Sequence, residues 1–402
     1  MAPRLLAPPL SLYVHIPWCV RKCPYCDFNS HAAPTRLPQA QYVRALLEDL
    51  EHDLPRASGR ELVSVFFGGG TPSLFEPDWV GELLRGVRER IACAPDLEVT
   101  LEANPGTLER GRFAAYRKAG VNRVSLGAQS FDEGHLRVLG RIHGRGDIER
   151  AAEELHAAGI ENFNLDLMYG LPGQTPAQAL ADLEAALVLG PAHISHYQLT
   201  LEPGTVFYHR PPSLPTDDEV WDMQLACQER LARHGYQQYE VSAYARPGRR
   251  CRHNLNYWRF GDYLGIGAGA HGKLSDPRSS TVLRTARCRQ PRTYLTRSAA
   301  LRVVESRLVA PEELPFEYML NALRLLDGFE LEHFTAHTGL AADVLGGALA
   351  AACRRGLLAE KTPGTWAPTE LGRRFLNDLQ ALFLPDADVC RQNAYVSITA
   401  SS

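Results

Sequence analysis

The sequence contains no uninterrupted apolar stretch of about 18 residues, which is the length that a membrane-spanning helix needs. It also lacks a strong excess of charge, because 43 basic and 46 acidic side chains leave a formal net charge of −3. Overall charge therefore gives no bias toward nucleic acid. Proline at positions 3, 8 and 9 interrupts the apolar N-terminal residues, so we do not expect a secretory signal peptide. These absences predict a cytoplasmic protein without a transmembrane segment, for which peripheral membrane contact stays open.

The nine cysteines do not form a disulfide framework, because their number is odd and six of them are scattered along the chain. This usage fits a reducing compartment, in which we expect the scattered cysteines to be buried thiols. The other three form the motif Cys19-x-x-x-Cys23-x-x-Cys26. Thiolates bind zinc or iron–sulfur clusters, and a structural zinc site takes four ligands. No second cysteine pair lies nearby, although His31 is a candidate fourth ligand. On a four-iron cluster, three thiolates would leave one iron open for another ligand.

Strand and helix signals alternate over the first 200 residues or so. Predicted strands cover 10–16, 62–67, 98–101, 123–126, 163–168 and 193–199, with helices predicted over 39–54, 77–91, 108–119, 148–158 and 176–189. Six such units imply a parallel sheet with right-handed crossovers. The fold class we predict is α/β, a partial (β/α)6 barrel of the TIM type. Polar and glycine-rich residues follow the strands, and this end of a parallel barrel carries the chemistry.

The second half of the chain changes in character. A helix is predicted over 217–234, residues 239–273 are rich in aromatic residues, arginine and glycine, and residues 274–306 resemble an irregular linker or β-ribbon. From Pro311 the order helix–helix–β-wing–helix predicts a winged-helix-like module, which alone does not imply DNA binding. We therefore divide the chain into a barrel (1–240), a connecting segment (241–310), a C-terminal α+β module (311–384) and a mobile tail (385–402).

Two further features accompany the cysteine motif. Tyr25 directly precedes Cys26, and the sequence Gly68-Gly69-Gly70-Thr71-Pro72 follows the second predicted strand, where glycine allows backbone to approach a ligand closely. In this setting the CxxxCxxC motif resembles that of the radical S-adenosylmethionine superfamily. The resemblance implies a [4Fe–4S] cluster on the three cysteines and S-adenosylmethionine on its open iron. It also implies that Tyr25 lies beside the adenine and that the glycine segment binds the methionyl amino group.

The segments YVHIPWCVRKCPYCDFNSH, GGGTPS, EANPG, GAQSF, LGRIH and NLDLMYGLPGQT are similar to those of the oxygen-independent coproporphyrinogen III oxidase group. The resemblance covers the chain from Tyr13 to about Glu202. It implies that S-adenosylmethionine is bound by Tyr13, Gly69, Gly70, Thr71, Glu102, Gln129, Arg141 and Asp166. Carboxylate, amide and guanidinium groups suit a ligand that has an ammonium group, a carboxylate and ribose hydroxyls.

The sequence departs from these oxidases at Phe28, where they carry a further cysteine. It also contains His253-Asn254-Leu255-Asn256-Tyr257-Trp258, and HNxxYW resembles the signature of the HemW-type heme chaperones. A heme site needs an axial ligand and a flat apolar wall. His253 is a candidate ligand, Tyr257 and Trp258 are candidates for the wall, and Cys251 and His271 are further candidate ligands. The alternative is that this segment packs over the open edge of the barrel and His253 forms an ordinary hydrogen bond.

Three functions follow from these resemblances. The first is a heme chaperone that binds heme and transfers it to an acceptor, such as a respiratory or storage heme protein. The second is a coproporphyrinogen III oxidase that converts propionates to vinyl groups through radical decarboxylation. Phe28 and the HNLNYW segment favour the first. A radical methyltransferase or cyclase is the third, and it has no dedicated motif in this sequence.

Overall fold

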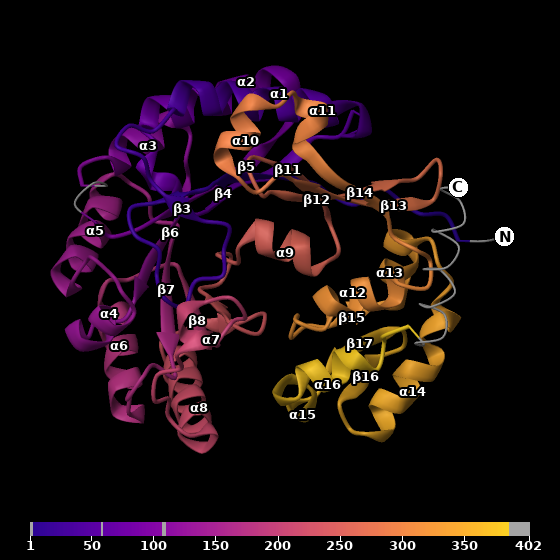
Figure 1. Ribbon diagram of the computed structural model, residues 1–402. Coiled ribbons are helices and arrows are strands. Elements are labelled where there is room, and N and C mark those ends of the chain that lie inside the picture. The colour runs from indigo at the N-terminus through magenta and orange to yellow at the C-terminus, as the bar shows by residue number, and fades with distance from the viewer. Residues whose placement is uncertain (1–2, 58, 107–109, 386–402) are drawn as a thin grey trace.

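The computed structural model describes residues 3–57, 59–106 and 110–385. Apart from Pro385, the tail that we expected to be mobile lies outside these residues. Most strands belong to a single sheet, with the order β14-β13-β12-β11-β1-β4-β5-β6-β7-β8-β10-β9. The sheet curves as an arc around an interior in which helix α9 (Arg252–Trp258) lies (Figure 1).

The six predicted βα units are present and parallel. Their strands are β1 (Leu10–Ile16), β4 (Leu62–Gly69), β5 (Cys93–Ala103), β6 (Arg123–Gln129), β7 (Phe163–Tyr169) and β8 (His193–Gln198). Their helices are α1 (Gln39–Ala57), α2 (Pro77–Arg90), α3 (Phe113–Ala119), α5 (Arg145–Ala157), α6 (Pro176–Val188) and α8 (Asp217–Arg233), with short helices α4 (Glu133–Val138) and α7 (Val206–His209). The strands are buried on both faces, as in β1, where six of seven residues are buried, which is typical of a parallel sheet covered by helices.

Residues 241–310 contribute more to the sheet than the linker or ribbon that the sequence predicted. Strand β11 (Asp262–Ile266) lies parallel to β1 on the side opposite β4. Strands β12 (His271–Asp276), β13 (Thr281–Arg287) and β14 (Val303–Leu308) then extend the sheet in antiparallel fashion. At the other end, β10 (Ala243–Ala245) and β9 (Gln237–Gln238) follow β8. Strand β1 is therefore an interior strand, with a neighbour on each side.

The predicted helices, β-wing and final helix are present in the C-terminal part, with three helices before the wing. It contains α12 (Leu314–Ala322), α13 (Leu331–Thr338), α14 (Gly346–Arg354), α15 (Glu370–Arg374) and α16 (Leu376–Ala381). A small antiparallel sheet orders β15 (Phe329–Glu330), β17 (Thr365–Pro368) and β16 (Leu358–Thr362). Its core includes Tyr318 and Phe334 and is shared with Phe260 from the end of α9.

Several contacts join the C-terminal part to the barrel, and two of them lie just after α12. The Arg324 guanidinium lies 3.1 Å from the Glu240 carboxylate, which is almost fully buried, and the Leu326 N–H donates to the Tyr239 carbonyl. They hold α12 against the open side of the arc. Among the described helices, no single one is long and apolar enough to cross a membrane; only the sharply bent pair Leu331–Thr338 and Ala342–Arg354 meets the length and composition required.

Candidate functional site

The three motif cysteines lie on the loop that follows β1. Its ends are held together by β2 (Trp18–Cys19), which pairs with β3 (His31–Ala32). Within the loop, the Cys26 N–H donates to the Cys23 carbonyl over 3.2 Å. All three thiols are free and half-buried. Burial raises the pKa of the Cys19 thiol, whereas the Thr71 hydroxyl acts in the opposite direction. Burial also raises the pKa of Cys26, so the thiolates need a cationic centre to become stable.

The spacing of the thiols suits a cluster better than a single ion. A tetrahedral zinc ion with Zn–S bonds of 2.3 Å would hold its sulfur ligands about 3.8 Å apart. Among the described residues, the three loop thiols do not all lie within 4.8 Å of one another. The ligand atoms that do meet this limit belong to Glu98, Cys251 and His253. The donor set and its wider spacing therefore fit a [4Fe–4S] cluster, which accepts three thiolates and leaves one iron open.

A hydrogen-bonded chain connects the cysteine loop to the ends of β4 and β5 and to Arg141, which follows α4. The Thr71 hydroxyl donates to the Cys19 sulfur at 3.5 Å, and the Asn104 amide donates to the Thr71 oxygen at 3.0 Å. Arg141 donates to the Asn104 side-chain oxygen and, through its other terminal nitrogen, to the Cys23 sulfur at 3.7 Å. Thr71 and Arg141 were expected at the site. Asn104 was not, although it stands in the EANPG segment that carried the resemblance.

The glycines after β4 are required by close packing. A Cβ on Gly69 would lie 2.6 Å from the His15 ring, and its φ of +114° is one that glycine adopts readily. A Cβ on Gly70 would lie 2.6 Å from the Trp18 carbonyl oxygen, within the cysteine loop. These residues therefore set the distance between the cysteine loop and the end of β4.

Two carboxylates, Glu102 on β5 and Asp166 on β7, face the interior from strands that β6 separates. Burial, with the nearby Asp166 charge, raises the pKa of Glu102 to about 8, although a backbone N–H from Gly69 opposes this. Burial likewise raises the pKa of Asp166, which is partly offset by hydrogen bonds from Asn164 and Ser125. Like charges in a buried site raise each other's pKa, and a bound cation would reverse the effect. The pair therefore suits a ligand with a positively charged group.

The remaining predicted ligand-binding residues are held by neighbours. The Tyr13 hydroxyl bonds His15 Nδ1 at 2.8 Å, and His15 Nε2 donates to the Asn29 carbonyl at 2.9 Å. Gln129 has a φ of +71° and accepts a hydrogen bond from Tyr197 at 2.9 Å. The Tyr25 ring packs against Phe207, with centroids 6.4 Å apart.

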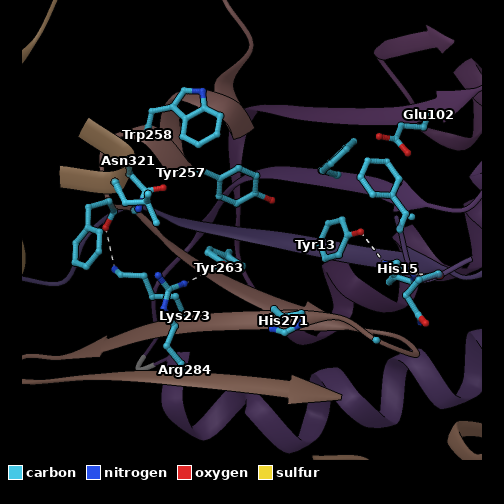
Figure 2. A pocket seen from close by; sticks show the side chains of 18 of the residues that line it. Tyr13, His15, Glu102, Tyr257, Trp258, Tyr263, His271, Lys273, Arg284 and Asn321 are labelled. Carbon is cyan, nitrogen blue, oxygen red and sulfur yellow. Dashed lines mark hydrogen bonds between the residues drawn. The ribbon is translucent and has the colours of Figure 1, made fainter. Parts of the chain in front are cut away.

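A cavity of about 520 Å³ lies inside the arc. Its wall includes Tyr13, Gly69 and Glu102 from the predicted S-adenosylmethionine site, together with Tyr257 and Trp258 from the HNLNYW segment (Figure 2). The other lining residues that matter for binding are Phe28, Phe66, Phe260, Tyr263, His271, Arg284 and Arg289. Three residues predicted for S-adenosylmethionine and two predicted for heme thus line one aromatic cavity, whose size is typical of small-molecule and cofactor sites. Thr71 and Arg141 line a separate cleft beside Cys23.

His253 is not part of this wall. Its side chain is 5% exposed, and its Nδ1 lies 3.1 Å from Glu98. Its ring stacks on Phe66 with centroids 4.1 Å apart, and Cys251 Sγ lies 3.1 Å from the same nitrogen. In this arrangement His253 is a packed histidine near the N-terminus of α9, which corresponds to the alternative raised from the sequence.

His271 is the histidine that faces the cavity with a free imidazole. It is exposed, and neither ring nitrogen forms a hydrogen bond within the described part of the chain. Among the described residues of the wall, the other histidine is His15, whose two nitrogens are both engaged. The sequence offered His271 only as a secondary candidate, because nothing in GAGAHGK marks the side to which the ring turns.

The cationic side chains of the cavity differ in whether they are already paired with a carboxylate. Lys273 is buried and pairs with Asp262 at 2.8 Å, and Arg284 is paired with Glu317. Arg289 is exposed and has no ion-pair partner among the described side chains. It lies beyond the HNLNYW segment, which supplied the heme-binding candidates in the sequence.

Comparisons with known proteins agree with these features. A model described as the radical SAM superfamily matches residues 13–186, and one described as the HemN C-terminal domain matches residues 309–375. The chain is 52% identical over 380 residues to "Heme chaperone HemW" of Escherichia coli. The alignment covers 94% of this chain and 99% of that protein. The protein of the same name from Haemophilus influenzae is 46% identical and covers 94% of this chain and 99% of its own length.

The fold is similar to that of a solved structure, the coproporphyrinogen III oxidase HemN from Escherichia coli, described as a radical SAM enzyme. The TM-score is 0.79 and the identity 23%, and the match covers 94% of this chain and 90% of the other. At this level of identity, the likeness concerns the fold.

Proposed function

The chain belongs to the HemW heme chaperone family within the radical SAM superfamily, and on this premise we propose that it binds heme in the aromatic cavity and transfers it to an acceptor protein. The observation that carries the proposal is the composition of the cavity wall. Aromatic rings, the His271 imidazole and the Arg289 guanidinium lie together, and neither polar group has a partner among the described side chains. They match the flat apolar faces, the iron and the propionates of heme.

Membership of the radical SAM superfamily implies a [4Fe–4S] cluster and S-adenosylmethionine. We assign the cluster to Cys19, Cys23 and Cys26. When bound, this pair of cofactors supplies one-electron chemistry. We assign S-adenosylmethionine to Tyr13, Tyr25, Gly69, Gly70, Thr71, Glu102, Gln129, Arg141 and Asp166. In this assignment, a cation facing Glu102 would lower the pKa that burial and the Asp166 charge raise.

For the iron ligand we propose His271 rather than His253. The His253 ring is enclosed by Phe66 and Glu98, so its role is to position α9, and with it Tyr257 and Trp258. A His271→Ala variant should change the Soret maximum and lose the low-spin histidine signal of bound heme. A His253→Ala variant should bind heme more weakly but keep that spectrum at saturation. An unchanged Soret band in His271→Ala would refute the ligand assignment.

Phe28 favours the chaperone function over oxidase activity. It occupies the position of the further motif cysteine, is 58% exposed and lines the cavity. It therefore offers a flat apolar contact where the oxidases carry a thiol. An anaerobic assay with coproporphyrinogen III, S-adenosylmethionine and reductant should give no protoporphyrinogen, while the same preparation binds heme stoichiometrically and loads an apo-heme protein. Turnover without heme binding would reverse this conclusion.

A further inference from the structure

Two histidines lie side by side on helix α13 of the C-terminal module. His333 and His337 are four residues apart, so they share one face of the helix, one turn after the other. The centroids of their rings are 3.8 Å apart, with an angle of 58° between the ring planes. Neither ring lines the aromatic cavity, and the proposed function uses neither of them.

Each of the two rings is held in place through its Nδ1 atom. His337 Nδ1 lies 3.2 Å from the backbone carbonyl of Arg259, at the end of α9. A carbonyl oxygen only accepts hydrogen bonds, so this nitrogen carries the proton and Nε2 keeps its lone pair. His333 Nδ1 lies 2.9 Å from the Tyr318 hydroxyl, which can accept a hydrogen bond as well as donate one. Both imidazoles can therefore present Nε2 as a ligand atom.

The two Nε2 atoms have no hydrogen-bond partner among the described residues. A metal-bound histidine usually donates its other ring N–H to a neighbouring acceptor, which fixes the tautomer and the orientation of the ring. The Arg259 carbonyl and the Tyr318 hydroxyl stand in these positions, and Tyr318 is fully buried. The pair thus combines two available nitrogens with the supporting hydrogen bonds that a metal site needs.

There is space for further ligands beside His333. A pocket of about 290 Å³ lies between α9 and the C-terminal module, and both His333 and Glu330 line it. Glu330 is exposed and directly precedes α13, so a carboxylate stands in the same pocket as the imidazole. Of the two guanidinium groups in this pocket, that of Arg250 is paired with Asp327 at 2.6 Å, and that of Arg259 is exposed to solvent.

We propose that His333 and His337 form a binding site for a divalent transition-metal ion, with water in its remaining coordination positions. Imidazole nitrogen suits zinc, nickel, copper and iron, whereas magnesium and calcium prefer oxygen ligands. The fold has already brought the two rings together, so they can bind one ion as a chelate. Because the Arg259 carbonyl holds one of these rings, a bound ion strengthens the contact between α13 and the helix that carries Tyr257 and Trp258. The proposal depends on neither the cluster nor heme.

The test is a calorimetric titration of Ni²⁺ into the full chain. The chain carries no affinity tag, and its cluster is loaded so that the motif cysteines are occupied. The wild type is compared with His333→Gln and His337→Gln, in which the amide can still donate to the former partner although the imidazole is removed. His209→Gln is the matched control, because His209 is an exposed histidine on α7, outside the pair.

We expect one Ni²⁺ to bind to the wild type at this site. Tyr318→Phe removes only the hydrogen bond to His333 and should weaken binding roughly tenfold, as is usual for such supporting partners. Loss of either imidazole should weaken it more, and His209→Gln should bind as the wild type does. Added Ni²⁺ should also raise the unfolding free energy of the wild type and of His209→Gln, but not that of the two variants of the pair.

Equal Ni²⁺ affinity in the wild type, His333→Gln and His337→Gln would overturn the proposal, because the ion would then bind elsewhere, for example at the exposed His271. A wild type that takes up no Ni²⁺ at micromolar concentrations would overturn it as well. Heme stoichiometry and cluster iron are measured in the same samples. Failure of either in the wild type would contradict the proposed function but not the metal site, whose ligands belong to neither.

Discussion

Glu102 is the side chain whose protonation the ligand should change most. In the free site its pKa is raised to about 8 by burial and by Asp166, so at neutral pH the carboxyl is largely protonated. A bound ammonium group favours the carboxylate and lowers this pKa, and binding therefore releases a proton.

The affinity for S-adenosylmethionine should consequently rise between pH 6 and 7.5, by up to about tenfold per pH unit. Glu102→Gln should weaken binding by roughly 1–3 kcal/mol and flatten this dependence. The variant also controls for the titration of the ligand's own amino group, which it leaves intact. Isothermal titration across this pH range measures both effects, and an equal slope in the two proteins would contradict the assignment.

Gly70 sets the position of the cysteine loop. A methyl group there would lie 2.6 Å from the Trp18 carbonyl oxygen, so Gly70→Ala must displace backbone and should cost about 1–3 kcal/mol of unfolding free energy. The iron content of this variant after reconstitution should fall together with its stability. Gly346→Ala on α14 is the control, because a Cβ there meets nothing within 4 Å. Chemical denaturation and iron analysis measure these two effects. Equal unfolding free energy and equal iron content in the two variants would contradict the prediction.

At the scale of elements, α9 depends on one buried carboxylate. The Glu98 oxygens accept from the backbone N–H groups of Arg252 and His253 at 3.1 and 3.2 Å. Burial alone would raise the pKa of Glu98, but hydrogen bonds from His253 and the charge of Arg123 outweigh it and lower the pKa to about 2. The carboxylate thus fixes the start of the helix that carries the cavity aromatics.

A folded-state pKa below the ordinary 4.5 means that Glu98 adds stability above about pH 4.5, and that this contribution is lost as the pH falls toward 2. The full contribution is roughly 3 kcal/mol. Glu98→Gln should remove most of this pH dependence and weaken heme binding, without loss of cluster iron. Denaturation curves between pH 3 and 7 measure how the unfolding free energy changes with pH. If Glu98→Gln kept the pH dependence of the wild type, the predicted role of Glu98 would be contradicted.

The strands and helices of this chain differ in how well the sequence predicted them. The six βα units were predicted because each long buried strand is followed by an amphipathic helix. Strand β11 was missed, since Asp262–Ile266 is short and enters a glycine-rich segment. The burial of His253 depends on Glu98 and Phe66, which are more than 150 residues away in sequence, and no local pattern encodes that contact.

On the scale of the whole molecule, one side of the cavity is lined by the C-terminal module, which the sequence predicted as a separate unit. Leu320 and Asn321 of α12 line it, and the Glu240–Arg324 pair holds α12 in place. The Arg324 guanidinium also lies 4.2 Å from the centre of the Trp258 ring. The motif residues on the barrel could be read from the sequence, whereas the shape of the cavity required the packing of both parts.

Arg324→Gln should therefore speed heme release several-fold, because it leaves Glu240 buried without its partner and removes a ring contact. Cluster content and S-adenosylmethionine affinity should not change. Arg355→Gln, which affects only an exposed pair with Asp378, is the control. Stopped-flow transfer of heme to apomyoglobin measures the rate, and identical rates in both variants would show that α12 does not hold the ligand.

The position of β1 between β4 and β11 has a consequence for synthesis. Its partner on one side is complete at residue 69, but its partner on the other side ends at Ile266. At about 5–20 residues per second, a ribosome needs roughly 12–50 s to extend the chain from residue 16 to residue 266. Until β11 is made, the strand that leads into the cysteine loop has at least one unpaired edge, so iron–sulfur loading that requires the finished sheet cannot begin before residue 266 is synthesised.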